Sequence, residues 1–175
     1  MEKKQMDRVP EMLEHIKEDM AEKIVAWQRQ MLSEDTNTIK SMIIEMLEKA
    51  TDSEDYIVIS YLRSSYITGS HRFKLAIYNE EPYVETFPPY KLIDMTPYYQ
   101  DIDEDFEGFV EKLKSEFIRI LGSEIEEVRR FYMEQLYFES MVFFQKIAEE
   151  LSENQGTTPL LFGGEMGETY QIGVI

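Results

Sequence analysis

Apolar residues in the N-terminal part of the chain recur at steps of three and four, which is the period of an amphipathic helix. Residues 33–37 (SEDTN) interrupt this period with side chains suited to capping helices. The pattern therefore predicts one helix over 9–32 and a second over about 38–50, and the short break indicates a helical hairpin. The apolar positions are Val9, Leu13, Ile16, Met20, Ile24, Trp27 and Met31, then Ile39, Met42, Ile43, Met46 and Leu47.

The middle of the chain changes to β-branched and aromatic residues with an alternating character, which indicates strands. We expect a first strand from residue 56, a three-residue hairpin loop at 68–70, a partner strand over 71–78 and a shorter third strand over 83–87. This pairing gathers the apolar side chains on one face, whereas a slip by one residue would scatter them over both faces. The expected apolar face consists of Ile57, Ile59, Tyr61, Phe73, Leu75 and Ile77.

The sequence that follows the predicted sheet returns to a helical pattern. Pro88-Pro89 is expected to end the sheet, and residues 90–100 are expected to form an irregular connector rich in tyrosine. A third helix is predicted over about 101–121, and Gly122 is expected to stop it.

A fourth helix is predicted over about 124–151, opened by a capping box between Ser123 and Glu126. Its apolar residues occupy nearly the whole circumference, which implies burial on more than one side. Two interpretations stay open: the core of a monomer, or an interface with a second copy or another protein. The interface residues would be Phe138, Phe143 and Phe144.

These elements predict the α+β fold class in a single domain over residues 1–151. It would combine an N-terminal helical hairpin, a three-stranded antiparallel meander and two long C-terminal helices packed on one face of the sheet. Residues 152–175 are rich in glycine and polar side chains, so we expect a C-terminal tail. The last six residues, YQIGVI, are suited to a final edge strand.

The charge of the chain narrows the choice of partners. Lys and Arg number 18 against 35 Asp and Glu, which gives a net charge of −17. The excess of acid lies in the predicted helices: residues 1–55 hold 8 basic and 14 acidic side chains, and residues 101–175 hold 6 and 17. Because phosphate binding needs clustered Lys and Arg, we expect no direct binding of nucleic acid.

Composition also indicates a compartment. The chain has no Cys, so it has neither disulfides nor thiolate metal sites. Its charged N-terminus lacks the apolar region of a secretory signal, and no apolar stretch approaches the length of a membrane span. We therefore expect a cytoplasmic protein without membrane association.

No motif predicts a metal, a cofactor or a catalytic residue. Glu11 and His15 lie one helical turn apart, but a metal site needs further ligands. Residues 101–108 imitate the start of a calcium loop, yet Phe106 stands where that loop needs Gly and Lys112 where it needs Glu. We expect no metal ion, no cofactor and no catalytic residue.

One constellation of side chains is suited to binding. The predicted second face of the sheet places basic residues among tyrosines, in the region of the chain that carries no excess of acid. Such a mixture can stack planar ligands or hold an anionic peptide. The alternative is structural: a helix covers this face and acidic side chains pair with the cations. The candidate binding residues are Tyr66, Arg72, Lys74, Tyr78 and, from the connector, Tyr90.

Two functions from different classes follow from these observations. The first is a non-enzymatic acidic interaction protein, such as an adaptor, inhibitor or immunity-type protein, that binds a basic partner protein or forms a homodimer. The second is a small-molecule sensor or an enzyme with a pocket at the tyrosine-rich sheet face. A largest pocket lined by Tyr66, Arg72, Tyr78 and Tyr90 would favour the second function, and a flat, helix-covered sheet would favour the first.

Overall fold

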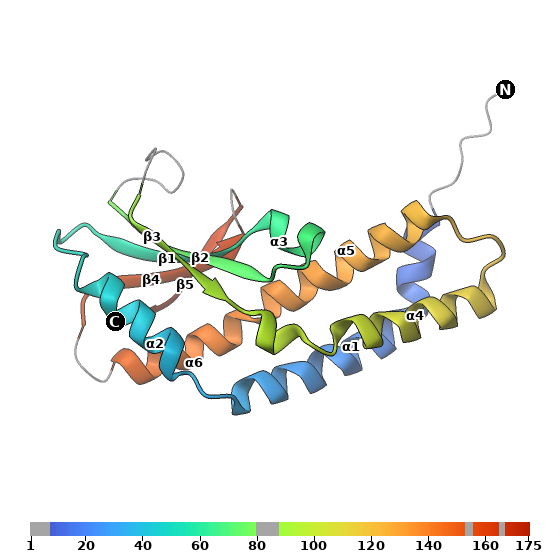
Figure 1. The fold of residues 1–175 in the computed structure, drawn as a ribbon, viewed down its shortest axis with the longest axis horizontal. Helices are drawn as coiled ribbons and strands as arrows, with labels where there is room; N and C mark the ends of the chain where they lie inside the picture. Colours follow the sequence, from blue (N-terminus) through green and yellow to red (C-terminus); the bar gives the residue numbers. More distant parts are fainter. Residues whose placement is uncertain (1–7, 80–87, 153–155, 165–166) are drawn as a thin grey trace, which may run out of the picture.

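The structure is a computed structural model that describes residues 8–79, 88–152, 156–164 and 167–175, apart from the side chain of Tyr66. It has an α+β fold, as the sequence predicts (Figure 1). The helices are α1 (Val9–Ser33), α2 (Asn37–Leu47), α3 (Arg63–Thr68), η1 (Thr96–Tyr99), α4 (Ile102–Glu116), α5 (Gly122–Glu139) and α6 (Met141–Ser152). The strands are β1 (Tyr56–Tyr61), β2 (Arg72–Tyr78), β3 (Tyr90–Asp94), β4 (Pro159–Gly164) and β5 (Thr169–Val174).

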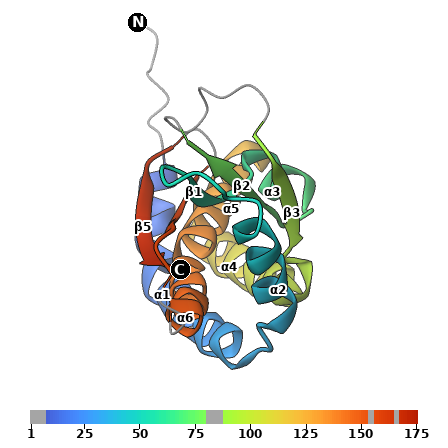
Figure 2. The same cartoon turned by 90° about the vertical axis from the view of Figure 1, so that its left-hand side faces the viewer.

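The five strands form one mixed sheet in the order β3-β2-β1-β4-β5. All neighbouring strands are antiparallel except β1 and β4, which are parallel. The long helices pack beneath one face of the sheet, and α1, α4 and α5 extend beyond it as a bundle (Figures 1 and 2). The molecule therefore has a helical layer and a sheet layer, and the sheet covers only part of the helices.

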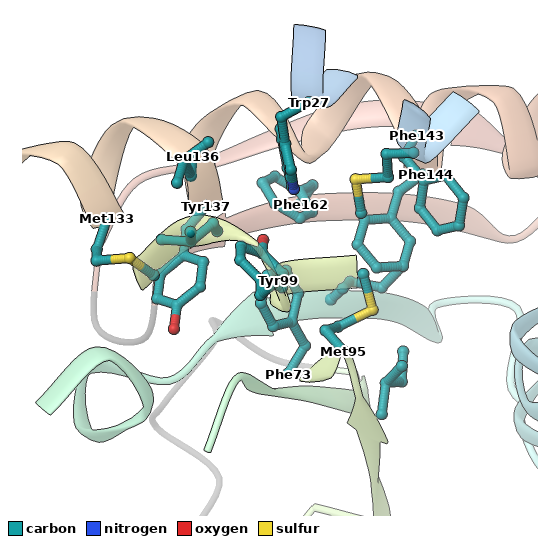
Figure 3. Close-up of a cluster of buried hydrophobic side chains, with 14 of the residues drawn as sticks. Trp27, Phe73, Met95, Tyr99, Met133, Leu136, Tyr137, Phe143, Phe144 and Phe162 are labelled. Carbon is teal, nitrogen blue, oxygen red and sulfur yellow. The ribbon is translucent and has the colours of Figure 1, made fainter. Parts of the chain in front are cut away.

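The core lies between the helices and the inner face of the sheet (Figure 3). Phe73 of β2 packs against Tyr137 of α5 and Phe144 of α6, with ring centroids 5.4 and 5.8 Å apart. Trp27 of α1 meets Tyr99 at 5.3 Å. This face carries the apolar residues that the strand alternation predicts, because Ile57, Ile59, Phe73 and Leu75 are all fully buried in it.

The N-terminal hairpin agrees with the periodicity of the sequence. Pro10 lies in the first turn of α1, where the missing N–H costs no helical hydrogen bond. Asp35, in the break, accepts a hydrogen bond from the backbone N–H of Asn37 at 3.0 Å. The indole N–H of Trp27 donates to the carbonyl of Tyr98 at 2.7 Å, so α1 is tied to the segment that follows β3.

The connection between β1 and β2 differs from the expected three-residue hairpin loop. The chain leaves β1 after Tyr61 and forms the helical turn α3, which ends at Gly69 in the left-handed conformation with φ of 66°. The Ser65 hydroxyl donates to the carbonyl of Arg72 and accepts from its N–H, at 2.9 and 3.0 Å. These bonds replace strand pairing, so the strand stops earlier while the predicted apolar face is kept.

The third strand of the meander lies later in the sequence than expected. The predicted strand 83–87 falls outside the described residues, and β3 occupies Tyr90–Asp94, which was expected to be irregular. Pro88-Pro89 precedes this strand and does not end the sheet. Pro89 needs no N–H here, because only its carbonyl takes part, accepting a hydrogen bond from Ile77 at 3.1 Å.

The ends of the helices at the turn between α4 and α5 also differ from those predicted. Helix α4 ends at Glu116, and α5 begins at Gly122. The residue that caps α5 is Glu124, whose carboxylate accepts from the N–H of Leu121 at 2.7 Å, and not Glu126. Arg8 holds the same carboxylate at 2.8 Å, and this hydrogen bond lowers the pKa of Glu124.

The long helix expected over 124–151 is two helices, α5 and α6, that meet at Ser140. This residue is fully buried, and its hydroxyl donates to the carbonyl of Tyr137 at 2.6 Å. A serine side chain that bonds back to the preceding turn competes with the helical ladder, which explains the break. The break lets α6 lie against β4 and β5 while α5 continues into the bundle (Figure 1).

The C-terminal segment expected to be a tail forms two strands of the sheet. Strand β4 lies between β1 and β5, and its Leu160 and Phe162 are fully buried. Strand β5 lies at the edge of the sheet, and α6 packs closely on it. A Cβ atom added at Gly173 would lie 2.7 Å from the Cβ of Ala148, so this contact requires glycine.

Candidate functional site

The outer face of the sheet lies on the side away from the core. Among the described residues, no helix lies across it, and the long helices are all on the other side (Figure 2). Strand alternation places on it a small cluster of buried residues, namely Val58, Ala76 and Tyr78, with Tyr56 and Leu161 packed against them. Leu92 and Tyr90 of β3 are exposed on this side. The face is therefore partly apolar.

Three of the predicted binding residues lie together on this face, with Lys74 at their centre. Its Nζ donates to the hydroxyl of Tyr78 at 3.2 Å and lies 5.7 and 5.6 Å from the ring centroids of Tyr78 and Tyr90. Tyr56 stacks on Tyr78 with centroids 6.0 Å apart. We name Tyr56, Lys74, Tyr78 and Tyr90 the lysine–tyrosine cluster. Because Tyr90 is 60% exposed, an aromatic ring and a cation are both presented at the surface.

The other two predicted binding residues are separate from this cluster. Arg72 is exposed at the far end of β2, opposite Asp94 of β3. Hydrogen bonds from Thr96 lower the pKa of Asp94, and the charge of Arg72 adds to this effect. Tyr66 belongs to α3, and its side chain lies outside the described part. Within the described residues, neither Arg72 nor Lys74 forms an ion pair.

The predicted interface residues occupy two environments. Phe143 and Phe144 are buried in the core of a single chain, so they offer no surface to a partner. Phe138 is 38% exposed on α5 and meets Tyr170 of β5 edge to face, with ring centroids 6.0 Å apart. Two turns earlier on α5, Phe131 borders an apolar groove of about 350 Å³ against α1. The exposed apolar surface therefore follows α5.

A hollow of about 620 Å³ lies between α3 and α5, and sequence reasoning missed it. Its cationic side chains are Arg63 of α3 with Arg129 and Arg130 of α5, and we name it the arginine hollow. The adjacent arginines at 129 and 130 could be seen in the sequence as a basic pair within an acidic segment. The third arginine is remote in sequence, so only the packing of α3 on α5 shows the convergence. The remaining lining residues are Ile67, Thr68, Gly69, Glu126 and Met133.

Helices α1 and α4 carry acidic residues both where they face each other and on their outer sides. Two ion pairs join these helices, Lys23 with Asp105 at 2.5 Å and Lys112 with Asp19 at 2.6 Å. Outside these pairs, seven exposed glutamates form a surface that we name the acidic ridge. They are Glu11, Glu14, Glu18 and Glu22 of α1 with Glu104, Glu107 and Glu111 of α4. Within the described part of the chain, Glu14 alone among them forms an ion pair, with its neighbour Lys17.

His71 has an unusual conformation at the start of β2. Its φ of 43° lies in the left-handed region, which is uncommon for residues other than glycine. The ring stacks on Tyr99 at 4.7 Å, and its Nδ1 lies 2.9 Å from the hydroxyl of Tyr137. Burial lowers the pKa of His71, so the neutral form is favoured in the fold. Both contacts of the His71 ring are with core residues, so we assign His71 a structural role.

No three His, Asp or Glu side chains in the described part of the chain are placed to hold a metal ion. Among the described residues, the lysine–tyrosine cluster lines neither the arginine hollow, nor the apolar groove beside Phe131, nor the hollows between α1 and α4. None of the described helices is both long and apolar enough to span a bilayer. Comparison with protein families, curated protein sequences and solved structures finds no match for this chain.

Proposed function

We propose that this chain is a non-enzymatic interaction protein that binds a basic partner protein through the acidic ridge. The observation that supports it is the arrangement of seven exposed glutamates on two adjacent helices. Helix α1 runs along the side of the molecule away from the sheet (Figure 1). A partner with a complementary positive surface could approach this side without meeting the sheet. Such complementarity raises association rates and selects among partners.

The spacing of the glutamates argues that folding alone does not require them. Glu11, Glu14, Glu18 and Glu22 follow one another at three or four residues, so each is a helical neighbour of the next. Like charges at these spacings destabilise a helix by about 0.2–0.5 kcal/mol per pair. The cations between α1 and α4 are engaged with Asp19 and Asp105 and leave the ridge with excess negative charge. A binding role accounts for this cost.

The test compares two charge reversals of equal size. One variant changes Glu18, Glu22 and Glu107 of the ridge to Lys, and the control changes the exposed Glu48, Glu54 and Glu149 to Lys. Both variants have the same net charge. Affinity capture from cell extract at low salt should recover a basic protein with the parent chain and the control but not with the ridge variant. Raising the salt should release the captured protein from the parent.

Equal capture by both variants, or equal loss in both, would contradict the proposal. Equal loss would mean that net charge alone retains the protein. Equal capture would mean that another surface is responsible.

A second function, ligand binding at the outer sheet face, is favoured by the position of Lys74 over two tyrosine rings. An anionic or planar ligand could stack on Tyr90 while it meets the ammonium group. Arg72→Glu combined with Lys74→Glu should then keep the fold and weaken binding at this face. If the double variant captures the same molecules as the parent, this second function is wrong.

A further inference from the structure

We propose that the arginine hollow binds a small anion of the phosphate class, such as the phosphate groups of a phosphorylated metabolite. Three arginine residues, Arg63, Arg129 and Arg130, line this one hollow. Its volume of about 620 Å³ lies within the roughly 300–1,000 Å³ of small-molecule sites. Guanidinium groups donate two parallel hydrogen bonds to phosphate oxygens, which makes arginine the side chain best suited to this ligand.

The acidic neighbours of Arg129 and Arg130 hold these two arginines only weakly. Arg129 pairs with Asp103 at 2.5 Å, and Arg130 pairs with Glu127 at 3.4 Å. Both carboxylates are at the surface, with exposed side-chain fractions of 76% and 49%. Surface pairs of this kind contribute about 0–1 kcal/mol, so a ligand that meets several guanidinium groups can displace them.

The lining of the hollow is held by the fold on both sides. On the α3 side, the helix ends at Gly69, and the hydrogen bonds between Ser65 and Arg72 attach α3 to the sheet. On the α5 side, the Arg129 guanidinium lies 5.6 Å from the centroid of the Phe106 ring. Met133, which is 2% exposed, closes the hollow towards the core. A site formed by fixed elements loses little conformational entropy on binding.

The charge distribution around the hollow favours a small ligand over a large one. Glu126 is a lining residue and opposes any anion, and the acidic ridge gives the molecule a negative field at long range. A large polyanion such as nucleic acid would meet that field over its whole length. A small anion within the hollow would lie among three arginine residues and would be screened from distant carboxylates. The hollow therefore favours small phosphates over polymers.

Titration calorimetry with inorganic pyrophosphate tests this proposal. We expect the parent chain to bind one pyrophosphate, and Arg63→Gln and Arg130→Gln each to weaken binding by about tenfold or more, as expected when a charge-assisted hydrogen bond is lost. Arg29→Gln is the matched control, because Arg29 is exposed on α1 outside the hollow. It removes the same charge and should leave the affinity unchanged. Arg63→Lys keeps the charge but loses the planar fork, so it should bind more weakly than the parent.

Three results would overturn the proposal: no binding by the folded parent, unchanged binding in the Arg130→Gln variant, or equal weakening in the Arg29→Gln control. Arg130 is exposed on α5, so its variant remains decisive if Arg63→Gln fails to fold. The acidic ridge contributes no residue to the hollow, and either proposal can therefore fail without the other.

Discussion

The two sides of helix α1 differ in what they contribute to the stability of the fold. The side towards the core carries Met12, Ile16 and Met20, which are 0–4% exposed. The opposite side carries Glu18 and Glu22, which are exposed, among the α1 glutamates of the acidic ridge. Burial of the first side stabilises the fold, whereas repulsion on the second side opposes it. The comparison teaches that the burial that stabilises α1 and the charge on its outer side can be changed independently.

The largest effect is expected where the helices meet the sheet. Leu136 of α5 is fully buried, so Leu136→Ala removes packed atoms and leaves a cavity. We expect a loss of about 2–5 kcal/mol in the free energy of unfolding, measured by urea denaturation. Val25→Ala is the control, since Val25 is 44% exposed on the outer side of α1, and it should cost much less. Equal losses in both variants would contradict the assignment of the core.

A smaller effect of opposite sign is expected from Tyr132 of α5. Its side chain is fully buried, and its hydroxyl has no hydrogen-bond partner among the described residues. Tyr132→Phe removes that unsatisfied group and keeps the ring that packs on Phe109. We expect the variant to be more stable by about 1 kcal/mol in thermal or urea unfolding. A clear loss of stability would show that the hydroxyl has a partner after all.

The stability of the folded chain should also depend on pH through His71. Burial lowers the pKa of His71 below its ordinary value of 6.5, so the unfolded chain binds a proton more readily than the folded chain. The contribution to stability is therefore complete above pH 6.5 and is lost as the pH falls towards the folded-state pKa. Asp103 and Asp94 oppose the shift and Arg129 adds to it.

The measurement is the free energy of unfolding between pH 7.5 and about 5.5, in the parent and in His71→Asn. Asparagine tolerates the left-handed conformation, so the replacement keeps the backbone of the turn. The parent should lose stability across this range more steeply than the variant. Identical slopes would mean that His71 does not titrate differently in the two states.

The smallest effect on stability is expected on the acidic ridge. Glu18→Lys with Glu22→Lys replaces like-charge repulsion on α1 with attraction to the remaining glutamates. Stability at low salt should stay the same or rise by a few tenths of a kcal/mol, because exposed pairs contribute little. The check is urea unfolding at low and high salt. A loss above about 1 kcal/mol would mean that these carboxylates support the fold.

The parts of the fold that were predicted depend on local periodicity. Helices α1 and α2 follow from apolar residues at steps of three and four. The inner sheet face follows from strand alternation, and this prediction is correct although the loop predicted between β1 and β2 is wrong. The break at Ser140 was missed because it depends on one serine hydroxyl within an apolar run. Strand β4 was missed because it pairs with β1 across about a hundred residues, and its leucines lie among glycines.

The candidate sites also differ in whether a local sequence pattern predicts them. Lys74, Tyr78 and Tyr90 come together because a period of two places Lys74 and Tyr78 on one face and β3 adds Tyr90 beside them. The arginine hollow depends on where α3 meets α5, and no local pattern contains that contact. The acidic composition was evident from the sequence, but the structure was needed to show which glutamates lie exposed on the outer sides of α1 and α4.

The most direct test of the acidic ridge is the association rate constant of the captured basic protein as a function of ionic strength. Electrostatic steering predicts a fast rate at low salt that falls steeply as salt is added. The variant with Glu18, Glu22 and Glu107 changed to Lys should associate more slowly and with a much weaker dependence on salt. The control with Glu48, Glu54 and Glu149 changed to Lys should follow the parent. Superimposable salt dependences for the two equally charged variants would contradict a role for the ridge.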